Sequence, residues 1–256
     1  MEFIGQSELI KNLKGTNARA ILVQGPRHFG KKTLIRQIYK ELGLYVYEVS
    51  GSVADFRATI DFIKTQAGAI MYLIPDVDRL SPGIQNLLLK ILEEPPMKSR
   101  FCLTASNSIL PTIKSRCVCY SMEPYTKEQI HGWLCDSEAQ LYSRYSNLFD
   151  NCVSSPGQAG IMLDWASIES TAGSEEHMPE IQPILKDSLA LVLNRANLLC
   201  RYLKDKNLDY YVFYLIAKAK YSQYESFGIL TRYFNELDRY VLCYFYSELW
   251  KEAACK

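Results

Sequence analysis

A glycine-bearing loop near the N-terminus has the residue types and spacing of a phosphate-binding site. The loop reads GPRHFGKKT over residues 25–33 and follows the apolar stretch Ala20–Gln24, which predicts a short strand. Gly25 and Gly30 permit tight backbone turns, and a helix that begins at Lys31 would direct free N–H groups toward an anion. Lys31 occupies the place of the lysine that contacts phosphates in a P-loop. The pattern therefore predicts a strand, a phosphate-binding loop and a helix.

The loop departs from the P-loop pattern at the position that holds Mg²⁺. That pattern has Ser or Thr directly after the lysine, whereas this chain has Lys32 there and Thr33 one position later. Because an ammonium group has donors and no acceptor, it is unable to ligate a cation, and we expect no magnesium-dependent chemistry at this loop. Two interpretations remain open. The loop binds phosphates, with Lys32 replacing part of the metal's charge, or it binds nothing.

A second stretch, residues 81–117, begins with a predicted helix that ends in two carboxylates. Ser81 is suited to cap this helix. Apolar residues then recur at helical spacing, at Ile84, Leu87, Leu88, Ile91 and Leu92. Pro95–Pro96 end the helix, so Glu93 and Glu94 fall in its last turn, where the helix dipole disfavours negative charge. Either these carboxylates are simply solvated, or a cationic partner on another element or another chain compensates them.

The chain next runs through a short apolar strand at residues 101–103 into the polar run 104–107. Ligands of open α/β sheets bind beyond the carboxyl ends of the strands, so this run predicts a sensor of something bound, with Asn107 as the sensor-like residue. The sequence LPTIKSRC follows at residues 110–117 and places Arg116 near the end of a short turn or helix.

These two runs resemble the AAA+ subunits of bacterial DNA polymerase III clamp loaders. The first run matches the family at Gln85, Asn86, Leu88, Leu89, Lys90, Leu92, Glu93, Glu94, Pro95 and Pro96. The second matches at Leu110, Pro111, Thr112, Ile113, Ser115, Arg116 and Cys117. The chain is most similar to the delta-prime type of subunit, with the gamma and tau subunits as relatives. The resemblance is strong over residues 1–120, fair to 165 and weak after 175.

The resemblance draws attention to a second departure from ATPase chemistry, at the end of the apolar strand 69–74. Family members that hydrolyse ATP end this strand with Asp-Glu, one carboxylate for the metal and one to activate water. Here Pro75 replaces the first, and Asp76 replaces the second with a shorter acid, so the Walker B motif is degenerate. Asp78 matches a carboxylate that the family usually keeps. Because Lys32 and Pro75 remove metal support on two separate elements, we expect no intrinsic ATPase activity.

The elements that must position these residues predict an α/β fold with helical additions. Residues 1–123 should form an AAA+ P-loop-like domain, a parallel sheet flanked by helices. Residues 124–169 should form a small helical lid, in which Gly157 or Gln158 lies where the family often carries the sensor-2 arginine. A polar linker follows at 170–180. Residues 178–256 should form an all-helical, tyrosine-rich C-terminal domain, which the resemblance likens to a collar.

Composition narrows the class of protein without naming a partner. The chain has 256 residues, 48% of them hydrophobic, and a net charge of +1, so no strong overall field attracts nucleic acid. The eight cysteines lack the paired spacing of a metal site, and we expect buried free thiols, without zinc or disulfides. No stretch has the pattern of a secretory signal or a membrane span. The expected location is the cytoplasm.

The resemblance implies a non-hydrolysing clamp-loader subunit that acts in DNA replication. Such a subunit would assemble with gamma/tau-like ATPase subunits and a delta-like subunit, and would reach the sliding clamp and primer–template DNA through that complex. Arg116 would act in trans as an arginine finger on a neighbour's ATP. ATP or ADP, bound without catalytic Mg²⁺, is the only cofactor that the resemblance suggests. The alternatives are a gamma-like ATP-hydrolysing subunit and an AAA+-fold adaptor without nucleotide chemistry, in which Arg116 forms an internal salt bridge.

Overall fold

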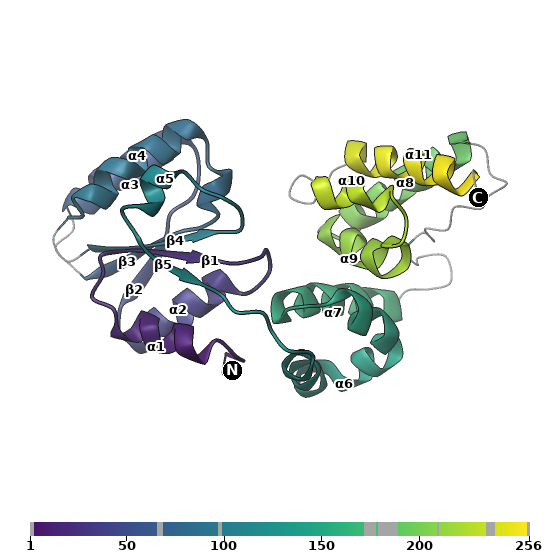
Figure 1. Ribbon diagram of the computed structural model, residues 1–256, viewed down its shortest axis with the longest axis horizontal. Coiled ribbons are helices and arrows are strands. Elements are labelled where there is room, and N and C mark those ends of the chain that lie inside the picture. The colour runs from purple at the N-terminus through teal and green to yellow at the C-terminus, as the bar shows by residue number, and fades with distance from the viewer. Residues whose placement is uncertain are drawn as a thin grey trace. The chain divides into compact units, whose positions relative to one another are not determined.

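The chain folds into two compact units, residues 1–125 and 126–256, each described here by itself (Figure 1). The computed structural model describes residues 3–65, 69–96, 99–171, 178, 189–208, 210–233 and 239–254. The division after Tyr125 lies close to the predicted boundary at 123. The second unit holds the helices predicted for both the lid and the collar-like domain, and their separation into two domains stays a prediction. Most of the predicted linker lies outside the described residues.

A five-stranded parallel sheet forms the centre of the first unit, as predicted. Its strands lie in the order β2-β3-β4-β1-β5, and every pairing is parallel. In chain order they are β1 (Ala20–Gln24), β2 (Tyr45–Glu48), β3 (Ile70–Ile74), β4 (Ser99–Ala105) and β5 (Val118–Ser121). The apolar runs of β1, β3 and β4 are buried because helices cover both faces of these central strands.

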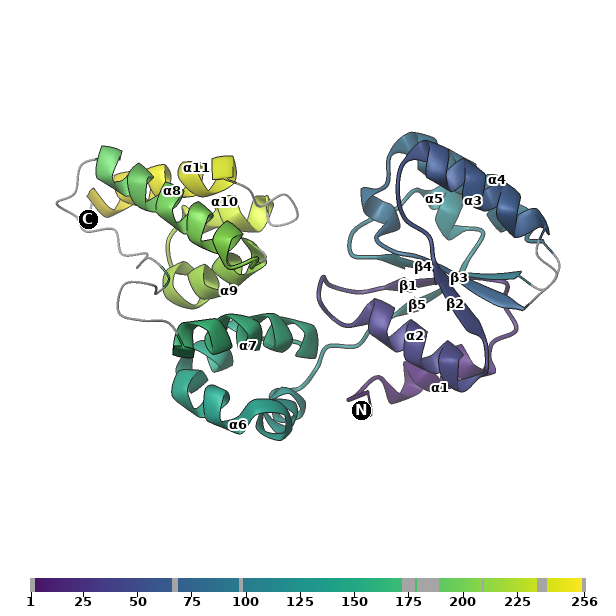
Figure 2. The ribbon, with the colours of Figure 1, turned by 180° about the vertical axis from the view of Figure 1, so that it is seen from behind.

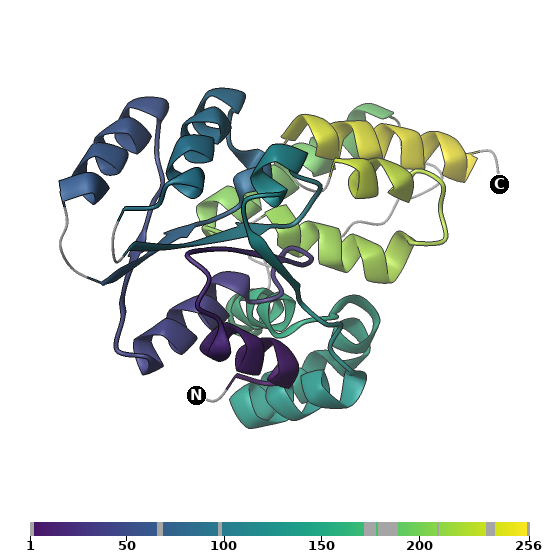
Figure 3. The same cartoon turned by 60° about the vertical axis from the view of Figure 1, so that its left-hand side comes forward.

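Helices pack on both faces of the sheet in this unit. One face carries α1 (Ser7–Gly15) and α2 (Lys31–Glu41), and the other carries α3 (Val53–Thr65), α4 (Pro82–Glu93) and α5 (Pro111–Lys114). Figures 2 and 3 show the same two helical layers from behind and from the side. Ser81 caps α4, with its Oγ accepting from the Ile84 amide at 3.4 Å, as the sequence predicts. A 3₁₀ turn, η1 (Val77–Arg79), follows β3.

The core on the α3–α4–α5 side joins these helices to the sheet. Tyr72 of β3 and Phe101 of β4 lie in adjacent strands with their rings stacked, 5.4 Å between centroids. The apolar face of α4 packs into the same cluster, together with Ile113 of α5, which is fully buried. A shared core therefore fixes the end of α4 and the turn after α5 relative to each other.

The second unit consists of helices in its described part. They are α6 (Lys127–Cys152), α7 (Pro156–Thr171), α8 (Leu189–Asp205), α9 (Tyr210–Tyr221), α10 (Phe227–Arg232) and α11 (Arg239–Ala254). Three short helices are predicted for residues 126–168, and the structure agrees. α6 holds two helices joined at a kink, with non-helical backbone at Glu138 and Tyr145, and α7 follows as the third. A capping box at Thr126 and Gln129 begins α6. None of the helices in the described ranges is long and apolar enough to cross a membrane.

Gln158, one of the two residues that the resemblance places where the family often carries the sensor-2 arginine, is buried within the second unit. Its carbonyl oxygen accepts from the Ser154 amide at 2.8 Å and from the Ser154 hydroxyl at 2.9 Å. Its amide nitrogen donates to the Tyr211 hydroxyl at 2.9 Å. This side chain therefore links the start of α7 to α9.

The described cysteines are free thiols. Only some are buried, however. Cys102, Cys152 and Cys200 are buried, whereas Cys119 and Cys135 are exposed on β5 and α6. The prediction of buried thiols is therefore wrong for Cys119 and Cys135. Cys119 is exposed because β5 is an edge strand of the sheet.

Candidate functional site

The candidate site lies at the carboxyl edge of three adjacent strands. β3, β4 and β1 are neighbours in the sheet, and all three end at the same edge because they are parallel. The loop 25–30 follows β1, Pro75 follows β3, and Ser106 follows β4. The fold therefore brings the predicted loop, the degenerate Walker B residues and the polar run together, at the place where open α/β sheets bind ligands.

Lys31 closes the glycine-bearing loop from inside. Its ammonium nitrogen lies 2.7 Å from the carbonyl oxygens of Gly25 and Pro26, and 2.9 Å from the Ser106 hydroxyl oxygen. An ammonium has three protons, so these contacts occupy its full donor capacity. The residue is 6% exposed, and this burial lowers the pKa of the Lys31 amine to about 8, although Asp76 and Asp78 oppose the shift. In this arrangement Lys31 binds the loop itself.

Residues outside the loop hold its backbone in place. Gly30 has a φ of +84°, which favours glycine, and a Cβ there would lie 3.1 Å from the Phe3 ring. A Cβ on Gly25 would approach the side chain of Met122 to 2.9 Å. The Tyr125 hydroxyl donates to the Phe29 carbonyl at 3.0 Å, with the two rings 5.4 Å apart. The segment after β5 and the N-terminal segment therefore both pack against the loop.

Asp78 ties the turn after β3 to the end of β4. Its carboxylate accepts from the backbone amides of Ser106 at 3.2 Å and Asn107 at 3.1 Å. It also accepts from the Asn107 side-chain amide at 2.9 Å. The sensor-like amide thus contacts a carboxylate of its own chain. Because Ser106 accepts from Lys31 and donates through its backbone to Asp78, one network joins the ends of β1, β3 and β4.

The remaining predicted residues of the loop and the Walker B motif are placed as follows. The Lys32 ammonium lies 3.8 Å from the carboxylate of Glu48, at the end of β2, and both Lys32 and Thr33 are exposed. Pro75 follows β3 directly. Asp76 has a left-handed φ of 47°, and its amide donates to the Thr104 hydroxyl at 3.0 Å. Among the described residues, no three His, Cys, Asp or Glu side chains gather as metal ligands.

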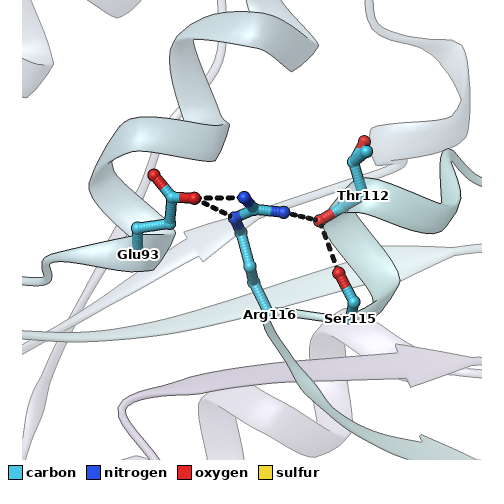
Figure 4. A network of polar contacts seen from close by, with 4 residues as sticks. All are labelled: Glu93, Thr112, Ser115 and Arg116. Carbon is cyan, nitrogen blue, oxygen red and sulfur yellow. Dashed lines mark hydrogen bonds and ion pairs between the residues drawn. The ribbon is translucent and has the colours of Figure 1, made fainter.

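Arg116 lies in a separate cluster at the junction of α4 and α5 (Figure 4). Its Nε donates to one Glu93 carboxylate oxygen at 2.9 Å, and its Nη2 donates to the same oxygen. Its Nη1 donates to the Thr112 carbonyl at 2.7 Å, an oxygen that also accepts from the Ser115 hydroxyl at 3.1 Å. The cationic partner predicted for the end of α4 is therefore on another element of the same chain, for Glu93 at least.

This ion pair has little weight in the stability of the fold. The Arg116 side chain is 28% exposed and the Glu93 side chain 51% exposed. Partly exposed pairs of this kind contribute about 0.2–1 kcal/mol, similar to the cost of about 0.3–1 kcal/mol for a carboxylate at the carboxyl end of a helix. The ion pair therefore offsets the energetic cost of placing Glu93 at the end of α4 and adds little further stability to the fold.

Sequence reasoning missed the contacts of two residues that shape the site. The sequence presents Ser106 only as one member of a polar run, yet in the structure it joins Lys31 to Asp78. Tyr125 contacts the loop from a segment distant in sequence. Phe3 contacts it too, in the opening segment that the resemblance implies lies near a nucleotide base. No local pattern signals contacts of this kind, although a serine directly after the strand beside β1 was an available indication.

The fold and the site resemble those of AAA+ proteins, and comparisons with known proteins support this resemblance. A family described as DNA polymerase III, delta subunit, matches residues 50–126. A solved structure of a DNA polymerase III gamma subunit-related protein from Thermotoga maritima has a TM-score of 0.53 with the chain. It is 14% identical and covers 96% of this chain and 98% of that one, a likeness that shows the fold.

Two curated relatives make the resemblance more specific. The DNA polymerase III subunit delta-prime of Buchnera aphidicola subsp. Baizongia pistaciae is 32% identical over 134 residues, which is 50% of this chain and 38% of the relative. The gamma subunit of Buchnera aphidicola subsp. Acyrthosiphon pisum is 29% identical over 171 residues, 52% of this chain and 47% of the relative. The match thus spans less than half of either relative. The chain resembles a clamp-loader AAA+ subunit and is like the delta-prime subunit, as its sequence motifs indicate.

Proposed function

We propose that the chain is a non-hydrolysing subunit of a DNA polymerase clamp loader. It would assemble with gamma/tau-like ATPase subunits and a delta-like subunit, and would take part in loading a sliding clamp onto primer–template DNA through that complex. The observation that carries the proposal is the closed loop, in which three acceptors of the chain itself occupy the Lys31 ammonium. A phosphate would have to displace all of these contacts before Lys31 could bind it.

The degenerate metal-binding positions support the same proposal. Pro75 supplies no carboxylate at the end of β3. Lys32 occupies the position where the P-loop pattern has the Ser or Thr that holds Mg²⁺, and its ammonium pairs with the Glu48 carboxylate. If ATP or ADP binds at all, these residues favour binding without catalytic Mg²⁺. Arg116 is proposed to act in trans as an arginine finger, because its guanidinium is partly exposed and lies outside the chain's own loop. A cytoplasmic location accompanies this role.

The purified chain is expected to release no phosphate from ATP above background, with or without Mg²⁺. The reason is the loss of metal support at Lys32 and Pro75 together with the closed contacts of Lys31. Steady-state phosphate release measures this directly, and calorimetry with ATP tests binding. The same chain added to the gamma-like ATPase and delta-like subunits of its organism should enter their complex and raise ATP turnover when clamp and primed DNA are present.

The gamma-like alternative makes the opposite prediction. It requires phosphate release by the isolated chain that is abolished by Lys31→Ala, and such a result would replace the proposal. A double variant, Lys32→Thr with Pro75→Asp, is a useful control because it restores the two metal-supporting positions. It should move the chain toward Mg²⁺ binding, although Lys31 must still leave its contacts before turnover can occur.

An adaptor without nucleotide chemistry is the second candidate, and the Arg116–Glu93 pair favours it. An arginine that serves only its own fold would show the same contacts with Glu93 and Thr112. The adaptor would enter the complex normally, yet its Arg116 would have no influence on ATP turnover by the neighbouring subunit.

A further inference from the structure

The Glu93–Arg116 cluster has a geometry that leaves part of the guanidinium available. Arginine has five N–H donors, two on each terminal nitrogen and one on Nε. Glu93 takes the Nε proton and one Nη2 proton, and the Thr112 carbonyl takes one Nη1 proton. Within the described ranges, one N–H on each terminal nitrogen therefore remains. This pair forms the fork with which arginine binds phosphate oxygens.

The elements that carry this cluster are held rigidly. Glu93 is in the last turn of α4, whose inner face packs into the core through Leu88 and Leu92. Arg116 follows α5, which is anchored by the buried Ile113, and the Arg116 amide donates to the Ile113 carbonyl at 3.1 Å. An arginine side chain has several rotatable bonds and, when free in solvent, samples many orientations. The contacts with Glu93 and Thr112 restrict it to one of them.

We infer that Glu93 is a positioning residue for Arg116, which holds the guanidinium so that its two remaining N–H groups face an anionic group of a docked neighbour. The inference rests on the proposed function, since it takes that anionic group to be the phosphate of a neighbour's ATP. Glu93 acts through Arg116 and contacts no reacting atom itself. A preorganised donor pair needs no reordering when charge develops on the transferring phosphoryl group, so its effect falls on the rate of the chemical step.

The neighbouring carboxylate supplies a matched control. Glu94 lies next to Glu93 at the same end of α4 and is also exposed, so Glu94→Gln removes the same charge from the same helix end. Arg116 contacts Glu93 in the described part of the chain, and Glu94 has no such contact with it. An effect of helix-end charge would appear in both variants, whereas an effect on Arg116 would appear only in Glu93→Gln.

The test measures ATP turnover by the complete loader with clamp and primed DNA, as a function of ATP concentration. The quantity compared is the kcat of the ATP turnover that depends on this chain. Glu93→Gln should lower it by about three- to tenfold, because the guanidinium loses its fixed orientation. The KM for ATP should change by less than about twofold. Glu94→Gln should behave like the wild type, and the melting temperature and assembly of all variants should stay near normal.

The same measurement in an Arg116→Ala background separates positioning from a structural role. If Glu93 acts through the arginine, Glu93→Gln should cause no further loss once the arginine is absent. An equal loss in both backgrounds, a loss of assembly, or a rise in turnover in Glu93→Gln would each overturn the inference. Unchanged turnover in Arg116→Ala alone would overturn the proposed finger. A loss in Arg116→Ala with wild-type turnover in Glu93→Gln would overturn only the positioning role.

Discussion

Arg116→Ala is expected to lower the stimulated ATP turnover of the assembled loader by about tenfold or more. A guanidinium supplied in trans stabilises charge on the transferring phosphoryl group, and isolated GTPase examples lose roughly 10³–10⁵ in rate without it. A ring with several ATP sites should lose less, because its other interfaces keep their own arginines. Folding and assembly should remain near normal, since the Arg116–Glu93 pair is partly exposed and contributes about 1 kcal/mol or less. Phosphate release by the reconstituted loader with clamp and primed DNA gives the measurement.

Two further variants sharpen this experiment. Arg116→Lys keeps the positive charge but loses the fork, so it should restore little of the turnover. Lys114→Ala removes an exposed cation from the last turn of α5 and serves as the control for general loss of charge at this surface. Turnover that is unchanged in Arg116→Ala, with assembly confirmed, would contradict the finger and favour the adaptor.

Lys31→Met is expected to destabilise the first unit by about 2–4 kcal/mol. The substitution keeps much of the volume but leaves the Gly25 and Pro26 carbonyls and the Ser106 hydroxyl without their buried donor, at about 1 kcal/mol or more for each. A loss of this size corresponds to a fall of roughly 10 °C in melting temperature for a unit of this length. Chemical denaturation of the purified chain, followed by circular dichroism, measures the change.

The pH dependence of this effect has a definite sign. Burial lowers the Lys31 pKa from 10.5 to about 8, so between these pH values the unfolded chain binds a proton that the folded chain has released. Wherever the unfolded state binds more protons, the free energy of unfolding rises with pH. Lys31→Met lacks this contribution. The difference in stability between the wild type and the variant should therefore grow from pH 8 to pH 10 in favour of the wild type.

The adjacent lysine provides the control for both measurements. Lys32 is exposed, and its ammonium lies 3.8 Å from the Glu48 carboxylate, which is a long ion pair. Lys32→Met should therefore change the free energy of unfolding by less than about 0.5 kcal/mol. Equal effects of the two substitutions, or a Lys31→Met variant as stable as the wild type, would show that Lys31 does not hold the loop. Such a result would remove the closed loop as the observation that carries the proposed function.

The sequence by itself determined the architecture of the first unit and the identity of its candidate residues. Short apolar runs that alternate with helical patterns indicate a parallel sheet covered on both faces, because such strands must be buried on both sides. Ser81 and Pro95–Pro96 mark the ends of α4 through local backbone chemistry, and the structure confirms both. The runs around Glu93 and Arg116 were distinctive enough to indicate the clamp-loader resemblance, which the comparisons confirm.

Only the tertiary structure decided which partners these residues have. Glu93 and Arg116 are separated by 22 intervening positions, and the sequence left open whether the partner of each lay in this chain or another. The answer depends on the shared core that brings the end of α4 beside α5. Likewise, the sequence placed Lys31 in a phosphate-binding pattern, whereas its contact with Ser106 arises because β1 and β4 are neighbours. Side-chain pairing across a sheet edge follows from strand order, which local spacing does not encode.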